Sequence, residues 1–162
     1  MKMSFLSFLI FVLLLHGLSA AAVSGPREMT NALYVEYAGS GGLYSLNYDR
    51  VIWRLDEMNG FGARAGLSWL PLKDEGIDNI LILPMMATWL YGRTQHFLEV
   101  DAGVALRTAS NKYEINTRPY PAFNIGYRAR APGSGATFRI GISPLFFDGL
   151  KFWGQVSIGR AF

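Results

Sequence analysis

The most constraining feature of the sequence is a regular two-residue alternation in the stretch HFLEVDAGVALRT, residues 96–108. One set of alternate positions carries Leu98, Val100, Ala102, Val104 and Leu106, and the other carries Glu99, Asp101, Gly103, Ala105 and Arg107. A β-strand points successive side chains to opposite faces. The stretch therefore predicts a strand with one apolar face and one face that is charged or very small.

Comparable runs recur along the chain, separated by clusters of Gly, Pro, Asn and Asp that are typical of turns. They predict eight strands, over residues 31–38, 43–54, 61–70, 80–91, 96–108, 120–130, 136–146 and 152–162. The two longest predicted loops cover residues 71–79 and 109–119. Short links favour an antiparallel up-and-down meander, and an even number of strands lets the first and last pair to close a barrel.

The predicted polar faces carry small residues and single charges, whereas the apolar faces carry large residues. Arg139, for example, lies between Phe138 and Ile140. The interior of an eight-stranded barrel is just wide enough for side chains to fill, so the small and charged faces belong inside. Predicted strands of 8–13 residues also match the roughly 9–11 that a tilted strand needs to cross a bilayer. The pattern predicts an all-β fold, an eight-stranded transmembrane barrel with a polar, plugged interior.

Four acidic and four basic residues fall on the predicted interior faces. We expect them to form a lumenal network of ion pairs, because a charge in a narrow lumen is tolerated only when it is paired and hydrogen-bonded. A row of solvated charges on a soluble sheet is the alternative interpretation. The predicted network consists of Glu36, Asp49, Arg64, Glu99, Asp101, Arg107, Arg128 and Arg139.

Some features fit this scheme less well. The predicted strand 80–91 is apolar on both faces, which leaves its register open, and Pro84 suggests a bulge there. Arg50 falls on an apolar face and requires a bulge or a side chain that reaches the membrane surface. Aromatic residues near strand ends are expected to form interfacial girdles, and these are Tyr37, Tyr44, Trp69, Trp89, Phe97 and Trp153.

The first 22 residues have the composition of a secretory signal peptide. Lys2 precedes an apolar run over residues 5–15, and small residues at 19–22 fit a cleavage site. The run is too short for a transmembrane helix, which needs about 20 residues, although an uncleaved anchor is the alternative. The predicted organisation is a signal peptide over 1–22, a short periplasmic segment over 23–30 and the barrel over 31–162.

Composition narrows the class of partner and of chemistry. With Lys2 removed from the 15 basic residues, 14 remain against 12 acidic ones, a balance that does not favour nucleic acid. The chain has no cysteine and therefore no disulfide or thiolate metal site. His96 is the one histidine outside the signal peptide, and Phe97 and Leu98 follow it where a nucleophilic serine would be needed beside it. We expect no catalytic, cofactor or metal site.

Four stretches carry a resemblance to a known group of proteins: NALYVEYAGSGGLYSLNYDR, GARAGLSWLP, FLEVDAGVAL and FRIGISPLFFDGLKFWGQVSIGRAF. Residues 31–162 resemble the small eight-stranded outer-membrane β-barrel proteins of Gram-negative bacteria, an uncharacterised family among them. The resemblance implies a monomer surrounded by outer-membrane lipid, including lipopolysaccharide. It also implies biogenesis by periplasmic chaperones and the barrel-assembly machinery. Val156, Ile158 and Phe162 match the group's terminal assembly signal, and Arg160 departs from it.

The sequence thus predicts a non-enzymatic outer-membrane barrel with a structural or surface-interaction role. Two alternatives stay open. A soluble exported barrel that binds an apolar ligand would need large apolar residues inside. An outer-membrane enzyme that modifies lipid would need convergent polar residues near the outer rim.

Overall fold

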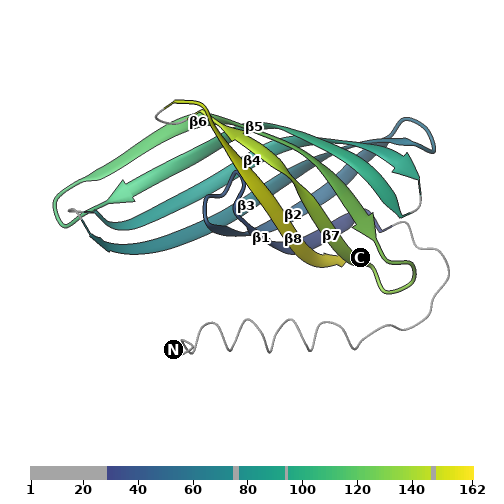
Figure 1. Cartoon of the computed structure of the whole chain (residues 1–162), viewed down its shortest axis with the longest axis horizontal. Coiled ribbons are helices and arrows are strands. Elements are labelled where there is room, and N and C mark those ends of the chain that lie inside the picture. Colours follow the sequence, from purple (N-terminus) through teal and green to yellow (C-terminus); the bar gives the residue numbers. More distant parts are fainter. Residues whose placement is uncertain (1–28, 75–76, 94, 147–148) are drawn as a thin grey trace.

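The computed structural model describes residues 29–74, 77–93, 95–146 and 149–162, so the predicted signal peptide and most of segment 23–30 lie outside the described residues. The described chain closes into an antiparallel barrel of eight strands, as predicted (Figure 1). The strands are β1 (Asn31–Tyr37), β2 (Tyr44–Arg54), β3 (Asn59–Asp74), β4 (Ile77–Arg93), β5 (His96–Ser110), β6 (Ile115–Arg130), β7 (Ala136–Leu145) and β8 (Lys151–Ala161). Among the described residues, no helix is long and apolar enough to cross a membrane.

The barrel closes between its first and last strands. β1 pairs with β8 from Ala32 opposite Ala161 to Tyr37 opposite Val156. The N–H of Phe162 donates to the carbonyl of Asn31 at 2.9 Å, which continues this pairing to the last residue. The seam therefore leaves neither β1 nor β8 as an open sheet edge along its paired length.

Side-chain directions follow the predicted alternation. On β5, Glu99 and Asp101 are buried, whereas Leu98 and Val104 are exposed. Every strand contributes exposed apolar side chains to the outer surface, among them Leu33, Leu46, Leu67, Met85, Leu98, Ile125, Ile140 and Val156. The two-faced pattern predicted for residues 96–108 is thus confirmed, with Leu98 and Val104 outside.

Strands β3 to β6 project beyond the other four at one end of the barrel, here called the hairpin end (Figure 1). The opposite end, here called the turn end, contains Asn31, Phe162 and the turns at 55–58 and 131–135. The predicted loops 71–79 and 109–119 are therefore wrong over most of their length. β3 continues to Asp74 and β4 begins at Ile77, while β5 continues to Ser110 and β6 begins at Ile115.

The β5–β6 hairpin is extended because its backbone groups find partners within the hairpin. The pairing runs without interruption to Ser110 opposite Ile115. The Asn111 side chain closes the turn, since its Oδ1 accepts the backbone N–H groups of Tyr113 and Glu114 at 2.9 and 2.6 Å. Pro119, the last residue of the predicted loop, lies within β6, where pairing with β7 begins only at Ala122, and an edge strand tolerates proline.

The structure determines the register of β4, whose two apolar faces left it open. The bulge predicted at Pro84 is wrong. Ala65 pairs with Met85 and Ser68 pairs with Ile82, so the pairing lapses on both strands and resumes without an inserted residue. Pro84 has no backbone N–H, so one hydrogen bond between the strands is lost, but this loss does not require an extra residue in β4. The side chains of β4 that are buried in the interior are Ile80, Ile82, Pro84, Met86, Thr88 and Leu90.

Arg50 needs no bulge of its own. It is exposed and pairs with Asn31, the first residue of β1, so it lies close to the turn end. A bulge follows it, because Val51 pairs with Gly62 and Trp53 pairs with Phe61. Ile52 is the extra residue.

Two predicted girdle residues face the interior instead. Phe97 is buried with Val51 and Leu90 at the turn end, and Trp153 packs against the buried apolar cluster at the hairpin end. Phe97 lies on the same face of β5 as the buried Glu99, and Trp153 lies on the same face of β8 as the buried Gln155. A position near a strand end does not show whether an aromatic side chain points inward or outward. The remaining predicted girdle residues lie on the outer face and are Tyr37, Tyr44, Trp69 and Trp89.

Closure depends on the absence of a side chain at Gly159, which pairs with the buried Tyr34. A Cβ at Gly159 would overlap the carbonyl of Leu33 and the side chain of Tyr34, whereas a Cβ at Gly154 would meet nothing. We expect Gly159→Ala to lower the free energy of unfolding by about 1–3 kcal/mol, as overpacking does, and Gly154→Ala to leave it nearly unchanged. Urea unfolding in detergent micelles measures both. Equal effects would show that the seam does not limit closure.

Candidate functional site

The interior of the barrel holds seven of the eight residues of the predicted charge network, each no more than 3% exposed. They form two groups. In the first, Arg64 contacts two carboxylates, with its Nη2 2.6 Å from Glu36 Oε2 and its Nη1 3.0 Å from Asp101 Oδ2. Its Nε also donates to Asn47 Oδ1 at 3.3 Å. One guanidinium thus joins side chains from β1, β2, β3 and β5.

The second group consists of two arginines and two acids. Arg128 donates from Nη2 to Asp49 Oδ2 at 2.7 Å and from Nε to Glu99 Oε2 at 2.5 Å. Arg139 also contacts both acids, Asp49 through its Nη2 and Glu99 through its Nη1 at 3.4 Å. Formal charge balances within this group, and its members come from β2, β5, β6 and β7.

Tyr34 lies between the two groups, a role that the sequence did not reveal. Its ring is 3.6 Å from the Cζ of Arg139 and 5.4 Å from that of Arg64, measured to the ring centroid. Aromatic faces attract guanidinium groups, and this attraction strengthens when both are desolvated. The alternation of β1 could have placed Tyr34 inside, because it is two residues from Glu36.

Apolar side chains seal the network at both ends, so the prediction of a polar interior is correct only for the central layer. At the turn end the sealing cluster is Val51, Leu90 and Phe97, and Tyr34 packs against Ala32 and Ala161 on the side of its ring that faces this end. At the hairpin end the cluster is Ile80, Ile82, Met86, Ala105, Tyr120 and Ala122.

The β1–β2 loop adds to this seal. It turns inward through Gly39 and Gly42, whose φ angles are 98° and 83°. Ser40 is completely buried, and its carbonyl accepts the Tyr120 hydroxyl at 3.0 Å. The loop therefore covers the charged layer on the side of the hairpin end, where Gly39 lies close to the carboxylate of Glu36.

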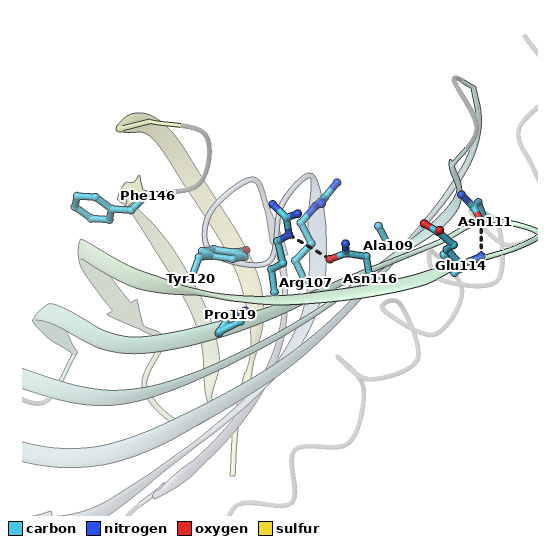
Figure 2. Close-up of a pocket in the computed structure, with 10 residues that line it drawn as sticks. Arg107, Ala109, Asn111, Glu114, Asn116, Pro119, Tyr120 and Phe146 are labelled. Atoms are coloured by element: carbon cyan, nitrogen blue, oxygen red, sulfur yellow. Dashed lines mark hydrogen bonds between the residues drawn. The ribbon is translucent and has the colours of Figure 1, made fainter.

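Arg107 does not join the network. It lies beyond the apolar cluster at the hairpin end, where it lines a cavity of about 400 Å³ above the β5–β6 hairpin (Figure 2). The register places Ala105 opposite Tyr120, Arg107 opposite Arg118, and Ala109 opposite Asn116 on one face of the hairpin. This face continues the interior face of the barrel past its mouth.

The remaining candidates lie on the outer surface. His96 is exposed at the turn end, where its ring stacks on Tyr127 and its Nδ1 is hydrogen-bonded to the Tyr127 hydroxyl. The described part of the chain contains no group of three or more His, Cys, Asp or Glu residues arranged to hold a metal ion. The predicted assembly residues Val156, Ile158 and Phe162 are all exposed.

A closed meander of eight antiparallel strands with an apolar exterior and a charged core defines the class of small transmembrane β-barrels. The chain is similar to the crystal structure of Ail, the attachment invasion locus protein of Yersinia pestis, with 14% identity, a TM-score of 0.53, and coverage of 83% of this chain and 98% of Ail. It is also similar to Ail in complex with the heparin analogue sucrose octasulfate, with 14% identity, a TM-score of 0.52, and coverage of 81% and 95%. The resemblance to eight-stranded outer-membrane barrels is thus confirmed for the fold. No family model and no curated protein matches the sequence.

The two groups differ in formal charge, because the first has one arginine with two acids and the second has two arginines with two acids. Unfolding experiments can measure the consequence of this difference. Glu99→Gln would leave Arg128 and Arg139 with one carboxylate, whereas Glu36→Gln would leave Arg64 with Asp101. We expect Glu99→Gln to lower the free energy of unfolding by about 3–5 kcal/mol, as breaking a buried ion pair does. Glu36→Gln should lower the free energy of unfolding clearly less, because Arg64 keeps Asp101 as a partner. Urea unfolding in detergent micelles compares them, and equal costs would contradict the division into two groups.

Proposed function

We propose that the protein is an integral barrel of the bacterial outer membrane with no catalytic role, and that its hairpin end is a surface for interactions outside the cell. The observation that carries this proposal is the distribution of side chains between the two faces of the sheet. Charged groups such as Asp49 and Arg128 are buried, while Ile140 and Ile142 are each 50% exposed. Soluble monomers rarely expose contiguous apolar surface on this scale, whereas lipid favours it.

The closed topology of the sheet also supports a membrane environment. In hydrocarbon each unsatisfied backbone group costs several kcal/mol, and a closed barrel satisfies these groups between its strands. The pairing of β8 with β1 meets this requirement.

The hairpin end is the end we assign to the outside. Outer-membrane barrels have short turns on the periplasmic side and longer connections on the outer side. Here the turn end has both ends of the barrel sequence, and the hairpin end has the β3–β4 and β5–β6 projections (Figure 1). In the proposed topology, the signal peptide over residues 1–22 directs export and is cleaved, segment 23–30 is periplasmic, and the barrel functions as a monomer in lipid that includes lipopolysaccharide.

The two alternatives find less support in the described residues. A barrel that binds an apolar ligand needs an empty apolar interior, but the centre of this barrel is filled by ion-paired side chains. A lipid-modifying enzyme needs a base and a nucleophile near the outer leaflet, but His96 lies at the turn end with Tyr127 as its partner.

The similarity to Ail favours a surface-interaction role over a purely structural one. Ail is an attachment invasion locus protein, and one of its structures contains a heparin analogue. By analogy, the projecting β5–β6 hairpin and its cavity are the part of this chain that we expect to meet a ligand.

Substitutions on the outer surface test the membrane environment. Ile140 lies within β7, whereas Ile115, which is 76% exposed, lies next to the turn at the tip of the β5–β6 projection. An arginine on the lipid face costs about 2–4 kcal/mol at the bilayer midplane, so Ile140→Arg should reduce the amount of folded protein in the outer-membrane fraction. Ile115→Arg should leave it unchanged. If both variants accumulate normally, or if the protein fractionates without detergent, the membrane assignment is wrong.

The terminal residue tests biogenesis separately. We propose that Val156, Ile158 and Phe162 are read by the barrel-assembly machinery and that periplasmic chaperones deliver the chain. Deleting Phe162 removes one exposed ring and one hydrogen-bonded pair at the end of the seam, so refolding in detergent should change little. Assembly in cells should fall strongly. Phe152→Ala, which removes an exposed ring at the other end of the same strand, is the control, and normal assembly without Phe162 would refute the signal.

A further inference from the structure

We infer that the cavity at the hairpin end binds a sugar that carries a sulfate or phosphate ester, with Arg107 and Arg118 contacting the ester group. This inference rests on the proposed function, since that places the cavity outside the cell. The inference adds to the proposed function the chemical class of the ligand and the residues that bind that ligand.

The arrangement of the two arginines carries the inference. Arg107 and Arg118 are direct cross-strand partners on one face of the β5–β6 hairpin, and both line the cavity. Two guanidinium groups on one wall of the cavity raise the positive potential there, which attracts an anion. Two planar guanidinium groups also match the geometry of an oxyanion, to which arginine donates two parallel hydrogen bonds.

The surroundings of the pair point to a molecule larger than an isolated ion. A cavity of about 400 Å³ is in the range of small-molecule sites. Ser110, Asn116 and Glu114 line it together with the arginines and supply donors and acceptors for hydroxyl groups. Figure 2 shows Glu114 toward the tip of the hairpin and Arg107 toward the barrel. This separation places the ester group near the barrel and the uncharged part of the sugar near the tip, because a carboxylate repels a second anion.

The site is held in place before a ligand arrives. Asn116 Oδ1 accepts the Nε–H of Arg118 at 3.2 Å, which orients that guanidinium. Tyr120, at the barrel side of the cavity, is buried and donates its hydroxyl to the carbonyl of Ser40. Such preorganisation reduces the entropy lost on binding.

The test measures binding to the full chain folded in detergent micelles, by calorimetry. Glucose 6-sulfate and glucose 6-phosphate are the two ester probes, and glucose, inorganic sulfate and inorganic phosphate are the probes for the two halves of the ligand. A preference for the sulfated probe points to an extracellular sulfated glycan, and a preference for the phosphorylated one points to a phosphorylated sugar of the cell surface.

The variants Arg107→Gln and Arg118→Gln should each weaken binding of the preferred ester about tenfold or more, as expected for loss of a charge-assisted hydrogen bond. Lys112→Gln is the matched control, because it removes the same charge from the same hairpin outside the cavity, where Lys112 lies over the Tyr113 ring. Its binding should stay within about twofold of the unchanged protein. Glucose, inorganic sulfate and inorganic phosphate should each bind much more weakly than the preferred ester.

Three results would overturn the inference: no binding of either ester, an equal loss with Lys112→Gln, or no loss with the arginine variants. None of them bears on insertion into the membrane, which fractionation of Ile140→Arg measures independently. Failure of the binding site and failure of the membrane assignment are therefore distinguishable.

Discussion

The ion pairs across the lumen are the interaction on which the rest of the structure depends. Four buried carboxylates meet three buried guanidinium groups in a space that only side chains can fill. Each arginine contacts two acids, so the contacts join β1, β2, β3, β5, β6 and β7 across the interior. Removing one partner of such a set leaves an uncompensated buried charge, so an arrangement of the strands that separates these residues is costly.

The apolar layers at the two ends follow from this arrangement. Water near a buried ion pair weakens the attraction between its charges, because the attraction falls as the local dielectric constant rises. Phe97 and Leu90 cover the network at the turn end, and Tyr120 and the inward loop around Ser40 cover it at the hairpin end. Tyr120 also borders the outer cavity, so one side chain separates the sealed interior from the surface that we propose binds a ligand.

The exterior and the projections follow from the same geometry. With the charges inside, the strands present their large apolar side chains outward, where lipid accommodates them. The projecting part of β5–β6 keeps the same alternation, so the interior face of the barrel continues as one wall of the cavity. On that wall Arg107 occupies a position equivalent to Glu99 and Asp101, but outside the seal.

For most strands the sequence by itself determined which set of alternate residues faces inward, because a period of two is a local property of each strand. This pattern predicted the eight strands, the closed barrel and the polar face of β5, which includes Glu99 and Asp101. The register of β4 did not follow, since both of its faces are apolar, and neither did the length of the β5–β6 hairpin, which depends on pairing and on the Asn111 turn.

Only the tertiary structure decided which charge meets which. Glu36 and Arg64 lie on strands that are not neighbours, and whether they meet depends on the stagger of the strands around the barrel. Arg107 has the same inward direction as Glu99, yet its height along β5 places it beyond the apolar layer and in the outer cavity. Side-chain direction is set within a strand, whereas height and partner are set between strands, and no local pattern records them.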